Sequence, residues 1–135
     1  MILDTSVLVA AEWRRLRFED LLHALGGESV AIAAITAAEL LHGCHRVTDR
    51  SVRARRSAFV EGVLEAIPVL PYGVPEARRH AELWAELARE GKLIGPYDLV
   101  VGATALARGH SLATLNRDEF ARIHGLRLVP TERFQ

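Results

Sequence analysis

A chain of 135 residues, half of them hydrophobic, can bury one core but is too short for two independent domains, so we expect a single domain over residues 1–135. Its 17 basic and 17 acidic residues give a net charge of zero, which excludes a global positive field that would attract a polyanion. The lone Cys44 excludes an internal disulfide, and the longest apolar stretch (99–107) is too short to cross a bilayer. The N-terminus lacks the basic region of a signal peptide, which predicts a cytoplasmic protein.

Strand and helix signals alternate along the chain. Short apolar runs predict strands, and apolar residues at three- and four-residue spacing predict helices. Glycines end several helices, and Thr36-Ala-Ala-Glu39 has the form of a capping box. In chain order the predicted elements are strand 1–3, helix 7–11 after the helix-start residues 4–6, helix 15–25, strand 30–35, a helix from 36, helix 53–67, strand 69–71, helix 77–88, helix 96–109, strand 111–115 and strand 126–129. Five short strands separated mainly by helices predict an α/β sandwich around a parallel sheet.

Polar side chains gather where the predicted strands end. In an open parallel sheet ligands bind beyond the carboxyl ends of the strands. Asp4 ends the first strand, Glu39 lies in the first turn of the helix after the second, and Asp98 begins the helix that turns back into the fourth. If that helix runs antiparallel to its strand, its first turn lies at the same edge. The residues predicted at this edge are Asp4, Glu39, Asp98, Asn116, Asp118 and Glu119.

Each of these residues also fits an ordinary helix cap, because carboxylates and short polar side chains favour helix N-termini. Their convergence favours a metal site instead. Two carboxylates about 4 Å apart repel each other by roughly 4 kcal/mol at an effective dielectric of ~20, and a divalent cation removes that cost. Oxygen-only ligands at an open site suit Mg²⁺ or Mn²⁺ and indicate phosphoryl transfer to water.

Motifs along the chain resemble the PIN-domain ribonucleases, and within them the VapC-type toxins of bacterial toxin-antitoxin pairs. The resemblance covers nearly the whole chain, in the family's order and at its usual separations. Its segments are MILDTSVLVA, ITAAELLHG, GKLIGPYDLVVGATALARG and SLATLNRDEFARIHGLRLVP.

The resemblance implies a set of catalytic residues. Asp4, Asp98 and Glu39 would hold the metal, and Thr5 or Ser6 would orient Asp4. The position after the strand-four threonine is Asp in many members but Asn116 here. Asp118 or Glu119 could supply the missing charge, and both stay open. The implied catalytic set is Asp4, Glu39, Asp98, Asn116 and Glu119.

The resemblance also implies a fold, a reaction and partners. The fold would be a three-layer PIN-like sandwich with a central five-stranded parallel sheet of order 3-2-1-4-5. The reaction would be Mg²⁺- or Mn²⁺-dependent RNA hydrolysis that leaves a 5′-phosphate. The partners would be a second copy of the chain and a small cognate antitoxin.

Two surfaces are candidates for partners. A group of arginines could contact RNA phosphates: Arg46, Arg50 and Arg53, with Arg55 and Arg56 close in sequence and Arg14, Arg15 and Arg17 nearby. These arginines could equally form a solvated helix face. Trp13, Leu16, Phe18, Leu21 and Leu22 could bind an antitoxin helix or pack in the core. Trp84 and Leu87 suit the core or a dimer interface.

Two other functions compete with the nuclease hypothesis. A phospho-receiver domain also places aspartate and magnesium at a sheet edge, but Asp4 has no acidic neighbour and Lys92 is the only lysine. A non-enzymatic binding module would use the carboxylates as caps, and it would show no binding of divalent cations by calorimetry.

Overall fold

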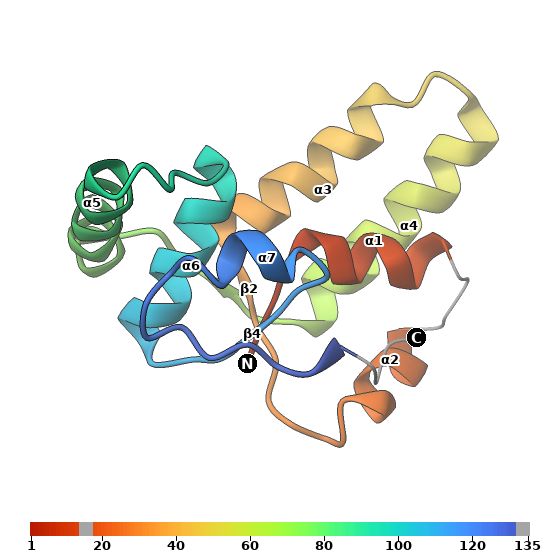
Figure 1. Ribbon diagram of the computed structural model, residues 1–135. Coiled ribbons are helices and arrows are strands. Elements are labelled where there is room, and N and C mark those ends of the chain that lie inside the picture. Colours follow the sequence, from red (N-terminus) through yellow and green to blue (C-terminus); the bar gives the residue numbers. More distant parts are fainter. Residues whose placement is uncertain (14–17, 132–135) are drawn as a thin grey trace.

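The computed structural model describes residues 1–13 and 18–131 (Figure 1). Its helices are α1 (Thr5–Trp13), α2 (Phe18–Ala24), α3 (Ala34–Arg46), α4 (Arg50–Ala66), α5 (Val74–Arg89), α6 (Pro96–Arg108) and α7 (Arg117–Phe120). Its strands are β1 (Ile2–Leu3), β2 (Ile32–Ala33), β3 (Val69–Leu70) and β4 (Leu112–Ala113). None of the described helices is long and apolar enough to span a bilayer.

The strands pair in parallel, as predicted. β1 pairs with β4 and β2 pairs with β3. Single parallel bridges join Ile2 to Ala31 and Leu112 to Leu128. The predicted strand 126–129 therefore contributes one bridge rather than a strand, and within the described residues the five predicted strands are four short strands plus that bridge.

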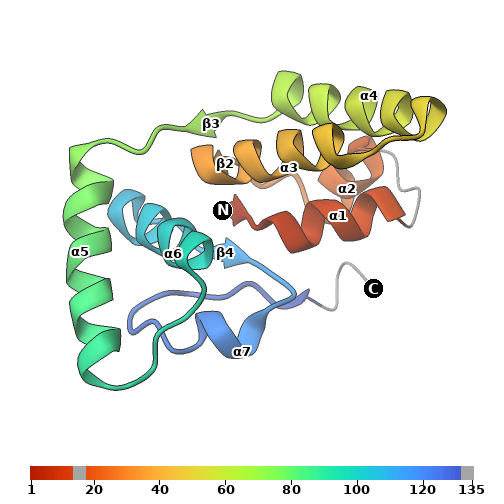
Figure 2. The same ribbon diagram turned by 90° about the horizontal axis from the view of Figure 1, so that it is seen from above.

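Side-chain alternation along each strand builds two separate cores. Successive strand residues point to opposite faces. The first residues of β1 and β4 and the second residue of β2 (Ile2, Leu112 and Ala33) join one core, whereas Leu3, Ala113 and Ile32 join the other. Figure 2 shows α5 and α6 on one side of the strands and α1 to α4 on the other. The chain is thus layered as helices, strands and helices.

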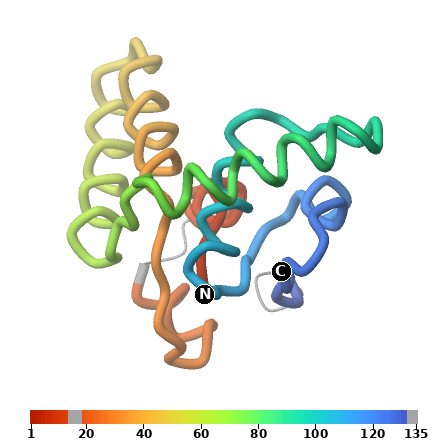
Figure 3. The backbone as a smooth tube through the Cα atoms, turned by 90° about the vertical axis from the view of Figure 1, so that its left-hand side faces the viewer, coloured from red at the N-terminus to blue at the C-terminus, as the bar shows by residue number. Residues whose placement is uncertain are grey.

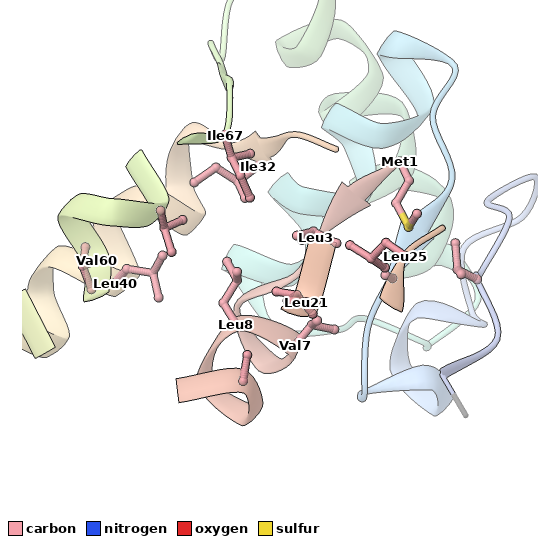
Figure 4. Packing of buried hydrophobic residues seen from close by; sticks show 14 of the residues in the cluster. Met1, Leu3, Val7, Leu8, Leu21, Leu25, Ile32, Leu40, Val60 and Ile67 are labelled. Carbon is pink, nitrogen blue, oxygen red and sulfur yellow. The ribbon is translucent and has the colours of Figure 1, made fainter. Parts of the chain in front are cut away.

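The core on the α1–α4 side is aliphatic and closely packed. Leu3 and Ile32 come from the strands, and Leu8, Leu40 and Val60 come from α1, α3 and α4 (Figure 4). All five are at most 5% exposed. This packing fixes the start of α1 and the middle of α3 against the end of β1.

Helix α6 lies in the other core, as its nearly continuous apolar sequence predicts. Most of its residues from Leu99 to Ala105 are buried. A Cβ added at Gly102 would lie 2.4 Å from Cδ1 of Ile123, so only glycine allows this close packing without a shift. The helix ends at Gly109 in the left-handed conformation (φ 69°) and the chain turns directly into β4. That tight turn brings the N-terminus of α6 to the carboxyl edge of the strands.

Helix starts are where sequence and structure differ most. The strand predicted over 30–35 stops at Ala33, because α3 begins at Ala34 with Ala33 as its N-cap. The predicted capping box is therefore wrong: Thr36 is buried inside α3, and Glu39 lies in its second turn rather than its first. Helix α4 begins at Arg50, earlier than the predicted residue 53, because the Asp49 carboxylate accepts a hydrogen bond from the backbone N–H of Val52 (2.9 Å).

The other apolar residues that were assigned to the core or to a partner surface differ in how exposed they are. Leu21 is buried and Leu22 packs against the same core, so core packing is confirmed for both. Trp13 and Trp84 are 73% and 56% exposed, so a core role is wrong for both, whereas Leu87 is buried. Leu16 and the side chain of Phe18 lie outside the described part of the chain.

Candidate functional site

Asp4 is a buried carboxylate fixed at the junction of β1 and β4. Its backbone N–H donates to the carbonyl of Ala113 (2.9 Å), and its own carbonyl accepts from Val7 to begin α1 (3.1 Å). The side chain is 2% exposed, and its Oδ2 accepts hydrogen bonds from Ser6 Oγ and Thr114 Oγ1, each at 2.8 Å. Both bonds go to one oxygen, which leaves Oδ1 for a ligand.

Glu39 approaches Asp4 from α3. Thr5 Oγ1 donates to Glu39 Oε1 at 2.9 Å. Burial raises the pKa of Glu39, the Thr5 hydrogen bond lowers it in part, and the nearby Asp4 charge raises it again. The two hydroxyls predicted beside Asp4 therefore divide their contacts, with Ser6 on Asp4 and Thr5 on Glu39.

Asp98 lies in the first turn of α6 and interacts with the other acids. Its pKa is raised from 3.8 to about 7, first by burial, then by a hydrogen bond with the Glu119 side chain, and then by the charges of Asp4, Glu119 and Glu39. Asp98 is therefore close enough to the other three carboxylates to interact with them electrostatically. The sequence prediction that Asp4, Glu39, Asp98 and Glu119 gather at one edge is consistent with this electrostatic coupling.

Three of these acids, Asp4, Glu39 and Asp98, line a hollow that we call the acid pocket. It has a volume of about 560 Å³ and is lined on its polar side by Asp4, Thr5, Ser6, Glu39, Asp98 and Asn116. Its apolar side is formed by Val9, Ala10, Trp13 and Leu115. Asp118 and Glu119 line the adjoining hollow, which Asn116 shares. Glu119 interacts with the Asp98 side chain and is partly buried, whereas Asp118 is exposed, so Glu119 is the better candidate for the fourth acid.

Side-chain capping bonds do not account for Glu39, Asp98 or Asn116. Asn116 is the N-cap of α7 but makes no side-chain capping bond, and the N-caps of α3 and α6 are Ala33 and Gly95. Thr114 is a site residue that sequence reasoning did not assign. It donates to Asp4 and accepts from the backbone N–H of Asn116 at 3.0 Å. A threonine at the end of the strand beside Asp4 was the signal available for it.

The predicted arginine patch lies away from the acid pocket. Arg46 ends α3 and Arg50 begins α4, so both lie at the turn of the α3–α4 hairpin, which projects from the rest of the chain (Figures 1 and 3). Neither they nor Arg53 lines the acid pocket. Arg56 instead pairs with Glu12 of α1 at 3.1 Å. Arg14, Arg15 and Arg17 lie outside the described residues.

The residues present fit a hard divalent cation. The polar side of the acid pocket offers only oxygen donors, which are the ligands that magnesium and manganese prefer. Within the described residues, no three His, Cys, Asp or Glu side chains converge tightly enough to enclose a metal ion. Magnesium does not require such a cage, because it commonly uses one or two carboxylates and keeps several waters. The pKa of Asp98 is raised first by burial and then by the neighbouring carboxyl groups, and a bound cation would favour its ionised form.

Comparisons with known proteins agree with this geometry. Residues 1–126 match the PIN domain family. The chain is 34% identical over 129 residues to ribonuclease VapC1 of Rickettsia felis, covering 96% of this chain and 94% of that protein. It is 35% identical over 98 residues to a tRNA(fMet)-specific endonuclease VapC of Shigella flexneri, covering 73% and 72% of the two chains.

Solved structures give the same result. DNA-bound VapBC from Salmonella typhimurium matches with a TM-score of 0.84 and 31% identity over 95% of each chain. VapBC-5 from Mycobacterium tuberculosis matches with a TM-score of 0.75 and 30% identity over 95% of each chain. The parallel strands between two helix layers and the acid-lined pocket at the strand ends are consistent with these relatives. The chain belongs to the PIN-domain family and, within it, to the VapC ribonucleases.

Proposed function

We propose that this protein is a divalent-metal-dependent endoribonuclease that hydrolyses RNA phosphodiester bonds, with Mg²⁺ or Mn²⁺ as its metal. The observation that carries the proposal is the pocket that Asp4, Glu39 and Asp98 line together, with Glu119 interacting with Asp98 from the adjoining hollow. Membership of the VapC ribonucleases supports the choice of RNA as substrate.

Different side chains of the protein have different roles in the proposed reaction. Asp4, Asp98 and Glu39 would hold the cation, directly or through water, and Asn116 and Glu119 would orient the attacking water. Ser6 and Thr114 fix the Asp4 carboxylate, and Thr5 fixes Glu39. When bound, the cation supplies positive charge that lets a phosphate enter an acidic pocket and lowers the pKa of the attacking water. No covalent protein nucleophile takes part.

The direct test is RNA cleavage by the purified chain. We expect cleavage with Mg²⁺ or Mn²⁺, loss of cleavage in EDTA, and recovery when the cation is restored. RNA pools and initiator tRNA are suitable substrates, and sequencing of the product ends should find 5′-phosphates. Isothermal calorimetry should detect binding of Mn²⁺ to the metal-free protein. Cleavage that persists unchanged in EDTA would contradict the proposal.

Thr114→Val should weaken the site without unfolding the protein, because valine keeps the shape of threonine but cannot donate to Asp4 Oδ2. Groups that orient metal ligands typically contribute about 10- to 100-fold to metal affinity or activity. We expect a loss of that size in kcat/KM and in Mn²⁺ affinity. Thr104→Val is the matched control, because Thr104 donates to the carbonyl of Val100 within α6. Equal losses for Thr114→Val and Thr104→Val would show that Thr114 does not position Asp4.

We also propose that a cognate antitoxin neutralises the enzyme in the cytoplasm and that the chain is a homodimer. The antitoxin is supported by structural neighbours that are VapBC toxin-antitoxin complexes. The homodimer rests on the family resemblance. Arg46, Arg50 and Arg53 remain candidates for contacts to RNA outside the acid pocket.

For the fold we propose a single three-layer domain with strand order 3-2-1-4-5. It is supported by the β3–β2 pair, the Ala31–Ile2 bridge, the β1–β4 pair and the Leu112–Leu128 bridge, which join the segments in that sequence. β1, β2 and β4 each contribute one side chain to each core, so these strands join the two helix layers into one unit.

A further inference from the structure

Helix α1 presents a stripe of side chains that leads away from the acids. Thr5, Val9 and Trp13 occur at four-residue spacing, which places them on one face of the helix. All three line the acid pocket and also the smaller groove of about 170 Å³ between α1, α3 and α4. The stripe therefore connects Asp4, at the start of α1, with an indole at its end.

Trp13 is unusual for a large apolar side chain because it is 73% exposed, more than any other large hydrophobic side chain that the structure describes. The second tryptophan, Trp84, is also exposed but stacks on His80, with ring centroids 5.7 Å apart and an interplanar angle of 19°. Trp13 has no ring partner among the described residues. Trp13 is thus an exposed indole that lines the acid pocket.

The described lining of the acid pocket offers no basic side chain for the RNA backbone. Among the described residues that line it there is no lysine or arginine, and its polar side is acidic. A bound cation can hold one phosphate but provides little grip on the rest of the strand. Base stacking on an aromatic side chain supplies affinity without charge and tolerates any base.

We propose that Trp13 is a stacking platform for an RNA nucleobase next to the scissile phosphate, an inference that rests on the proposed function. The helical rise of about 1.5 Å per residue separates Thr5 from Trp13 by roughly 12 Å along α1. The stacked base therefore belongs to a nucleotide neighbouring the phosphate at Asp4 and Asp98, not to the reacting phosphate itself. The indole contributes binding of the strand, and the acids carry the chemistry.

Steady-state kinetics on a single-stranded RNA oligonucleotide test this role. Trp13→Ala should raise KM by roughly 5- to 100-fold, the range expected for loss of one stacked base, with kcat changed little. Trp13→Phe and Trp13→Tyr should recover most of the lost affinity. Trp84→Ala, the matched control, should leave KM unchanged. A substrate with an abasic site at the stacked position should raise KM for the wild type but not further for Trp13→Ala.

Fluorescence gives a second readout that does not need turnover. The chain has two tryptophans, so Trp84→Phe leaves Trp13 as the only indole and Trp13→Phe leaves Trp84. With Ca²⁺ in place of Mg²⁺, single-stranded RNA should quench the emission of Trp13 and leave that of Trp84 unchanged. This readout also decides the matter should Trp13→Ala fail to fold.

The outcomes separate the two claims. If the wild type cleaves RNA and Trp13→Ala has the same KM, the stacking platform is overturned while the nuclease stands. If RNA leaves Trp13 emission unchanged and only a bound protein alters it, Trp13 is a protein contact and the inference is again overturned. If the wild type cleaves no RNA under any cation, the proposed function itself fails.

Discussion

Asp98→Asn is expected to lower the rate of RNA cleavage by roughly 10²- to 10³-fold, the loss typical when one charge-stabilising group is removed from an active site. Asparagine keeps the shape of aspartate and an oxygen donor but removes the negative charge that, in the proposed function, would hold the cation. The measurement is kcat/KM with saturating Mg²⁺. Full activity in this variant would contradict the assignment of Asp98.

The same substitution should stabilise the metal-free protein, and the pH dependence gives the sign. The folded-state pKa of Asp98 is raised from 3.8 to about 7. Between these values the unfolded chain has lost the proton and the folded chain retains it, so the stability of the wild type falls as pH rises through this window. Above about pH 7 both states are ionised and the full cost of a charged Asp98 is present. Asp98→Asn has no such cost.

The stability gain can be measured by thermal unfolding in EDTA. Because Asp98 is partly exposed and solvent screens its charge, we expect about 1–2 kcal/mol at pH 8 and little difference near pH 4. That corresponds to a rise in Tm of several degrees. Asp118→Asn is the matched control, since Asp118 is exposed outside the acid pocket. A lower Tm for Asp98→Asn at pH 8 would show that the carboxylate stabilises the fold.

The meeting of the acids could be predicted from the sequence because it depends on topology. Asp4 follows a strand, and Asp98 begins a helix that turns tightly into the neighbouring strand at Gly109. In a parallel sheet this arrangement leaves little choice about where the two residues lie. The antiparallel course of α6 against β4 follows from a short connection, so the apolar pattern and the turn residues were sufficient to predict it.

The hydroxyl contacts could not be predicted in the same way. Which of Thr5, Ser6 and Thr114 reaches which carboxylate depends on side-chain directions and on the register of β1 against β4, in which Leu3 lies opposite Ala113. The apparent capping box at Thr36 was misleading because the buried strand end and the helix start share the same apolar alanines. Burial of Thr36 in α3 overrode the local capping signal.

The exposure of Trp13 also could not be predicted from the sequence pattern. Trp13 continues the apolar run of α1, and apolar spacing predicts the core for such a residue. Val7, Leu8 and Ala11 fill the buried face of the helix, which leaves Trp13 on the face toward the pocket. Only the packing of α1 against its neighbours decides this.

Arg108→Ala should destabilise the protein by about 2–3 kcal/mol. Glu76 of α5 is 1% exposed, and its Oε1 accepts from the backbone N–H of Gly73 (3.1 Å) and from Arg108 at the end of α6 (3.2 Å). Its Oε2 has no hydrogen-bond partner among the described residues. Removing the arginine leaves a buried carboxylate without its counter-charge, which costs several kcal/mol, reduced here because Arg108 is 37% exposed. Chemical denaturation measures the difference.

Two further variants separate the buried charge from loss of the arginine's packing. Glu76→Gln should rescue Arg108→Ala, because the double variant has no buried charge to compensate. Arg79→Ala breaks an exposed ion pair with Glu82 on the same helix α5 and should change stability by less than about 1 kcal/mol. If Arg108→Ala costs no more than Arg79→Ala, the ion pair does not stabilise the packing of α5 on α6. If Glu76→Gln gives no rescue, the loss comes from packing of the arginine side chain, and the charge of Glu76 is tolerated without it.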